Sequence, residues 1–69
     1  MNEDLLNKIA RMIMDIHNKG VKPCLVIVGR SEEPLLEGDI EFMGCNIMVD
    51  DRTKSRCDVY GKEAKRAVW

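Results

Sequence analysis

Four residues of this chain could together bind a tetrahedral zinc ion, namely His17, Cys24, Cys45 and Cys57. Structural zinc sites usually draw two ligands from one short motif, such as Cys-x-x-Cys or His-x-x-x-His. These four residues are 7, 21 and 12 positions apart, so they contain no such pair. The cysteines stand among β-branched residues instead, which is typical of small core side chains. We therefore expect no metal and no cofactor.

A second group with possible chemistry is acidic, and its carboxylates could hold a divalent cation. Its members are Glu37, Asp39, Glu41, Asp50 and Asp51. A metal-dependent hydrolase would need a lysine beside such acids, and Asp51 with Lys54 matches that pattern only weakly. No Ser or Cys has a histidine base, and residues 29–31 lack the glycine spacing of a phosphate-binding loop. The sequence thus predicts that the chain is not an enzyme, with a hydrolase as an unfavoured alternative.

Charge is segregated along the chain, although the formal net charge is only −1. Residues 1–30 carry +2, residues 31–51 carry −7 and residues 52–69 carry +4. Either these segments neutralise each other across a sheet, or the molecule has acidic and basic poles that dock head to tail. The basic residues that could contact nucleic-acid phosphates are Arg52, Lys54, Arg56, Lys62, Lys65 and Arg66.

The first three of these basic residues would share one face of an extended chain. No aromatic residue that could stack on bases is interleaved among them, and the acidic segment would repel a polyanion. A small nucleic-acid-associated regulator is therefore the alternative function, and not the first.

Size and composition limit the fold that must position these residues. A chain of 69 residues with 45% hydrophobic and 33% charged side chains is enough for one small domain, spanning residues 1–69. Its longest apolar run, residues 24–29, is too short to cross a membrane. The acidic start, Met-Asn-Glu-Asp, does not resemble a signal peptide, so we expect a cytoplasmic protein with cysteines as thiols.

Residues 2–19 have the pattern of an amphipathic helix. Asn2 is a good N-cap, and Gly20 suits the position just after the helix. The apolar residues that fall on one face are Leu5, Leu6, Ile9, Met12, Ile13 and Ile16. Met14 interrupts the pattern because it projects into the polar face.

Strands are predicted after this helix. We expect a turn over residues 21–23, a strand over 24–29, and a loop over 30–38 with one helical turn from Pro34. Alternating strands follow at 40–43, 45–49 and 57–60, with Gly44 as either a bulge or a tight hairpin turn. The tail, residues 62–69, could be a short helix or an edge strand. The predicted class is α+β, with the N-terminal helix on one face of a small, mainly antiparallel sheet of three to four strands.

The strand at 24–29 does not alternate, which predicts burial on both faces. One helix covers only one face of a small sheet, so another subunit is the simplest cover for the other. We therefore expect a protein-interaction module whose partner is above all a second copy. Methionine and aromatic residues are favoured at interfaces, and the candidates are Met14, Met43, Met48, Tyr60 and Trp69.

The middle of the chain also resembles a known group of proteins. Residues 24–30, an acidic loop and residues 42–51 are similar to small, mostly uncharacterised proteins of tailed phages and prophages. The segment from Gly44 to Asp51, Gly-x-x-Ile-x-Val-Asp-Asp, also resembles a strand of phage capsid and head-associated proteins. The resemblance implies a phage accessory or virion-associated protein that works by binding, in the cytoplasm of a bacterial host. It carries over no functional residue.

Overall fold

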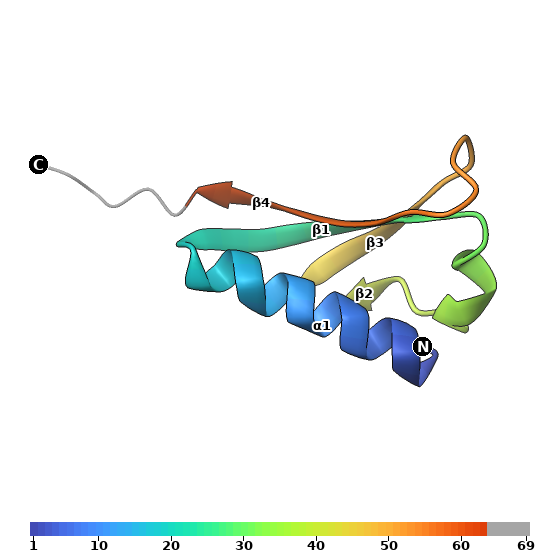
Figure 1. The fold of residues 1–69 in the computed structure, drawn as a ribbon, viewed down its shortest axis with the longest axis horizontal. Coiled ribbons are helices and arrows are strands. Elements are labelled where there is room, and N and C mark those ends of the chain that lie inside the picture. The colour runs from blue at the N-terminus through green and yellow to red at the C-terminus, as the bar shows by residue number, and fades with distance from the viewer. Residues whose placement is uncertain (64–69) are drawn as a thin grey trace, which may run out of the picture.

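One α-helix lies against one face of a four-stranded sheet in the computed structural model, which describes residues 1–63 (Figure 1). This arrangement confirms the predicted α+β class and the N-terminal helix on one side of the sheet. The opposite face carries no second layer within residues 1–63 (Figure 1). Trp69, Lys65, Arg66 and most of the tail, predicted as helix or edge strand, lie outside the described residues.

Helix α1 spans Glu3–Asn18. Asn2 caps it as predicted, because its side-chain oxygen accepts hydrogen bonds from the backbone N–H of Asp4 at 2.9 Å and of Leu5 at 3.2 Å. Gly20 follows the helix with a φ of +83°, which glycine adopts without strain. No helix in the described part of the chain has both the length and the apolar character needed to cross a bilayer.

The sheet has the strand order β2-β3-β1-β4. Strand β1 spans Val21–Gly29, β2 Glu41–Phe42, β3 Cys45–Asp50 and β4 Cys57–Glu63. The turn predicted over residues 21–23 is wrong, because these residues extend β1 and pair with Glu63, Lys62 and Gly61 of β4. The pairing slips between Pro23 and Leu25, and such an irregularity tolerates a proline inside a strand.

The sheet is mixed: β1 pairs in parallel with β3 and antiparallel with β4. The parallel pairing at the centre was not predicted, and it follows from the connection between the two strands. After β1 the chain passes through the 3₁₀ helix η1, Glu33–Leu36, and then turns through the β2–β3 hairpin. That hairpin reverses the chain, so β3 runs in the direction of β1.

The β2–β3 hairpin turns on Met43 and Gly44. Phe42 pairs with Cys45, so only two residues form the turn, and their φ angles are +50° and +80°. Two consecutive positive φ angles define the tight turn that suits the twist of a hairpin. Of the two alternatives that the sequence left open, the structure therefore has the hairpin, and it places Met43 at an exposed tip.

The core lies between α1 and the sheet. Ile9, Val26, Val28 and Cys45 are fully buried, and Leu5, Ile13 and Leu36 are nearly so. Because side chains alternate along a strand, Val26 and Val28 face α1, whereas Leu25 and Ile27 point to the other side, where they are half-buried. The non-alternating sequence of this strand therefore reflects its central position in the sheet.

Candidate interaction surface

The face of the sheet opposite α1, which we call the open face, is apolar at its centre. In the strand register, Leu25 of β1 lies beside Asn46 and Tyr60, and Ile27 lies beside Met48 and Asp58. Met48 and Tyr60 flank the central strand and are 56% and 45% exposed. Two of the predicted interface candidates therefore stand on the open face, beside the strand that suggested an interface.

Arg56 spans one end of the open face and connects three polar groups. Its Nε donates to Asp58 Oδ2 at 2.5 Å, and its two terminal nitrogens donate to Asp50 Oδ2 at 2.9 Å and to the Tyr60 hydroxyl at 2.6 Å. Asp50 belongs to β3, whereas Asp58 and Tyr60 belong to β4, so the guanidinium reaches across β1. The aliphatic part of Arg56 lines a hollow with Ile27 and Met48, and thereby shields part of the central strand.

The carboxylates of Asp50 and Asp58 balance the positive charge of Arg56. Hydrogen bonds from its guanidinium to Asp58, Asp50 and Tyr60 raise the pKa of Arg56. The pKa of Asp50 is lowered, first by the hydroxyl of Thr53, then by the backbone N–H of Arg52 and the Arg56 guanidinium. The acidic and basic segments of the chain thus meet at Asp50 and Arg56. This pair is of the kind that the neutralisation alternative predicts.

The predicted basic patch does not form one face in the described part of the chain. Residues 51–55 form turns and bends, so the extended conformation that would align Arg52, Lys54 and Arg56 is absent there. Arg52 and Lys54 are exposed on the β3–β4 loop, Arg56 is paired with acids, and Lys62 is exposed on β4. The loop follows from hydrogen bonds that Asp50 accepts from Arg52 and Thr53.

The remaining interface candidates lie away from the open face. Met14 is 50% exposed on the polar side of α1, and Met43 is 52% exposed at the hairpin tip. Met14 was correctly predicted to project from the polar side of the helix. The five candidates therefore do not form one continuous surface within residues 1–63, and only Met48 and Tyr60 share a face.

The groups with possible metal chemistry are dispersed. Cys45 is buried, Cys24 and Cys57 are half-buried, and His17 is exposed near the end of α1. Burial is the first cause that raises the pKa of the Cys45 and Cys57 thiols, which favours their protonated form. No cluster of three or more metal-ligating side chains occurs in the part of the chain that the structure describes.

The acidic residues are dispersed as well. The amine of Met1 lies 2.6 Å from Asp39 Oδ2 and 3.4 Å from Glu37 Oε1. Asp50 is engaged by Arg56 and Thr53 instead. Three of the five carboxylates that the sequence grouped as a possible cation site, Glu37, Asp39 and Asp50, thus serve two separate sets of contacts.

Glu32 holds two loops together, and no pattern in the sequence predicts this role. Its Oε1 accepts hydrogen bonds from the backbone N–H of Gly29 at 3.1 Å and of Arg56 at 2.8 Å. Its Oε2 accepts one from the Ser55 hydroxyl at 3.2 Å. The loop after β1 is thereby fixed to the start of β4, close to the Arg56 contacts on the open face.

Glu32→Gln should reduce the dependence of stability on pH. Hydrogen bonds from Arg56, Gly29 and Ser55, the first being the largest cause, hold the pKa of Glu32 below its ordinary value of 4.5. A carboxyl whose pKa is lower in the folded state stabilises the fold above its unfolded pKa, and loses that effect as the pH falls through the folded value. We expect urea unfolding at pH 7 and pH 3 to show a smaller difference for Glu32→Gln than for the unsubstituted chain.

Asp50 keeps part of the pH dependence in this variant, because its pKa is lowered too. Glu33→Gln is the control for the loss of one negative charge in the same loop, since Glu33 is exposed. An equal pH dependence in Glu32→Gln and the unsubstituted chain would contradict the contacts assigned to Glu32.

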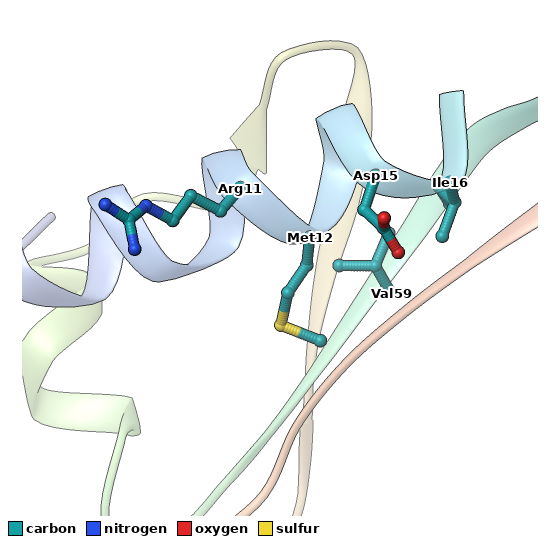
Figure 2. A pocket seen from close by; sticks show the side chains of 5 residues that line it. All are labelled: Arg11, Met12, Asp15, Ile16 and Val59. Carbon is teal, nitrogen blue, oxygen red and sulfur yellow. The ribbon is translucent and has the colours of Figure 1, made fainter. Parts of the chain in front are cut away.

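The outer edge of β4 borders a groove against α1. Figure 2 shows Arg11, Met12, Asp15 and Ile16 on the helix and Val59 on β4 around this groove. Met12 points toward the sheet, and its sulfur lies 3.8 Å from Cys57 Sγ (Figure 2). Within the described residues, β4 pairs only with β1, so its other edge is available for a further strand.

Sequence reasoning missed the Arg56 contacts and the β4 edge. The alternation Arg56-x-Asp58-x-Tyr60 was a usable signal, because residues two apart on a strand share a face and opposite charges there attract. The position of β4 at an edge had no such signal, since strand order depends on long-range pairing. No family model, curated protein or solved structure matches the chain.

Proposed function

We propose that the chain is a small protein-interaction module that associates with a second copy of itself through its sheet. The observation that carries this proposal is the seven-residue edge strand β4, which lacks a partner on its outer side within residues 1–63. Long unpaired edges are templates for pairing with another chain. The exposed apolar side chains of Met48 and Tyr60 on the open face support the same function.

A second copy is the favoured partner because the charges along β4 complement each other. Asp58 and Lys62 stand at equal distances on either side of Tyr60, so the strand matches its own reversed copy. Nucleic-acid binding gains no comparable support, since Arg56 is paired with two acids, and Arg52 and Lys54 lie on the β3–β4 loop whereas Lys62 lies on β4. The resemblance to phage proteins stays a prediction about origin.

The proposal predicts that the mass in solution depends on concentration. Light scattering coupled to size exclusion, with loading from about 1 µM to 1 mM, should show the average mass rising from one chain towards two. A mass of one chain throughout would contradict self-association. Tight, salt-sensitive binding of duplex or single-stranded DNA in a gel-shift assay would instead support the alternative, a nucleic-acid-associated regulator.

A further inference from the structure

We infer that two copies pair through antiparallel β4 strands around a two-fold axis at Tyr60, which joins their sheets into one. This inference rests on the proposed function, because it specifies how the self-association takes place. In this register Tyr60 lies opposite Tyr60 of the second copy, Val59 lies opposite Gly61, and Asp58 lies opposite Lys62. The contact is of the isologous kind, in which both copies use the same residues.

The backbone of β4 has the groups that this register needs. Gly29 N–H donates to the carbonyl of Arg56 at 2.9 Å, which fixes Arg56 as a residue whose backbone groups point to β1. Because backbone groups alternate along a strand, those of Asp58 and Tyr60 point to β1 as well, and those of Val59 and Gly61 point outward. Val59 and Gly61 of two antiparallel copies can therefore exchange hydrogen bonds on both sides of the axis.

The side chains on the open face complement each other in the same register. Asp58, Tyr60 and Lys62 alternate on β4 and share this face. Each Lys62 ammonium would lie opposite the Asp58 carboxylate of the other copy, and the two tyrosine rings would lie side by side. Asp58 already accepts from Arg56 through Oδ2, which leaves Oδ1 to accept from a lysine.

Within one copy, Lys62 has an unfavourable neighbour. The register places Lys22 of β1 directly opposite Lys62, and like charges in such a cross-strand pair are destabilising. A second copy would supply the missing carboxylate on the other side of Lys62. A lysine on an edge strand can also serve to prevent pairing, and the experiments below distinguish these two roles.

The helices would meet in the same dimer. Helix α1 contacts both β1 and β4, so it lies over the space between these two strands. Neighbouring strands are about 4.8 Å apart, and the two-fold axis of the dimer would pass half that spacing beyond β4. The helix would therefore lie about 5 Å to one side of the two-fold axis. Two copies of α1 would then be about 10 Å apart, which is the usual distance for packed helices. The groove lined by Arg11, Met12 and Asp15 would be enclosed between them, with its apolar floor removed from water (Figure 2).

Exchanged charges give the first test. The variant Asp58→Lys has lysine at positions 58 and 62, and the variant Lys62→Asp has aspartate at both. Residue 58 would then face a like charge at residue 62 of the other copy, so each variant alone should dimerise about tenfold more weakly. An equimolar mixture should form the heterodimer, because every pair across the axis is then of opposite charge. Sedimentation velocity at several concentrations measures all three samples, with thermal melts to confirm that each variant is folded.

Lys62→Asp is the more informative single variant, because Asp58→Lys also removes the contact with Arg56. The double variant, Asp58→Lys with Lys62→Asp, should recover the association of the unsubstituted chain. Stronger association of Lys62→Asp alone would show that Lys62 prevents edge pairing, and would overturn the inference.

A cysteine at the axis gives the second test. Opposite residues that do not exchange hydrogen bonds have Cα atoms about 4.5 Å apart, which is within disulfide range. Tyr60→Cys should therefore yield covalent dimers under mild oxidation. Lys62→Cys is the matched control, because two copies of residue 62 would be about 13 Å apart, which is too far for a disulfide. The unsubstituted chain has three cysteines, so it measures the cross-linking that does not depend on the added cysteine.

These results separate the inference from the proposed function. A mass of one chain at every concentration would refute both. Dimers that form equally well with Lys62→Asp, and that cross-link no more through Tyr60→Cys than through Lys62→Cys, would refute this register while leaving self-association in place. Mass above two chains would also contradict it, because the two-fold contact uses up the edge of each copy.

Discussion

Gly29→Ala should destabilise the domain by about 3 kcal/mol, which is a large part of the total stability of so short a chain. A Cβ atom at residue 29 would lie 2.7 Å from the backbone nitrogen of Arg56 and 2.9 Å from the carbonyl oxygen of Lys54. Both are backbone atoms at the junction that Glu32 also holds, so neither can move aside like a flexible side chain. Urea unfolding followed by circular dichroism measures the loss.

Gly20→Ala is the matched control for this variant. Residue 20 has a φ of +83°, and an added Cβ there would meet no atom within 4 Å. Its cost is therefore limited to backbone strain, about 1–2 kcal/mol. If Gly29→Ala is no less stable than Gly20→Ala, the close approach between the two loops does not limit the fold.

Ile9→Ala should have an effect of similar size through loss of packing. Ile9 is fully buried between α1 and the sheet, and replacing such a residue with alanine costs about 2–5 kcal/mol. A chain of 69 residues has a total stability of only about 3–10 kcal/mol. We therefore expect Ile9→Ala to lower the melting temperature strongly or to prevent cooperative unfolding altogether.

Two milder substitutions calibrate this result. Ile9→Val removes one methylene group from the same position and should cost about 0.5–1.5 kcal/mol. Met14→Ala removes a long side chain that is 50% exposed, and should change stability by no more than about 0.5 kcal/mol. A loss for Met14→Ala equal to that for Ile9→Ala would mean that the core does not lie where the structure places it.

Local sequence patterns predicted the helix and the strands of this fold well, but they did not predict which strands pair with each other. The 3.6-residue period and Asn2 located α1, and the run at 24–29 identified the central strand. The extension of β1 through Pro23 depends on β4, which is distant in the sequence, and so does the parallel pairing of β1 with β3. A proline-containing turn was the reasonable local interpretation, because nothing near residue 23 indicates a partner strand.

The candidate surface was predictable only in part, for the same reason. Exposed Met48 and Tyr60 were found from residue type alone, whereas Met14 and Met43, chosen on equal grounds, lie on other sides of the molecule. The sequence grouped Arg56 with neighbouring basic residues because it counted charges along the chain. In the folded chain Arg56 belongs with Asp50 and Asp58, since a strand places residues two apart on one face.

The shortness of β2 determines how large an assembly this sheet can build. Its two residues pair only with Cys45 and Asn46, so on this side of the sheet the edge is divided between two short stretches, β2 and the rest of β3, whereas β4 offers seven residues on the opposite side. A sheet with two long open edges can add copies indefinitely and grow into fibres. In the dimer that we propose, pairing would use the one long edge of each copy, so growth would end at two copies.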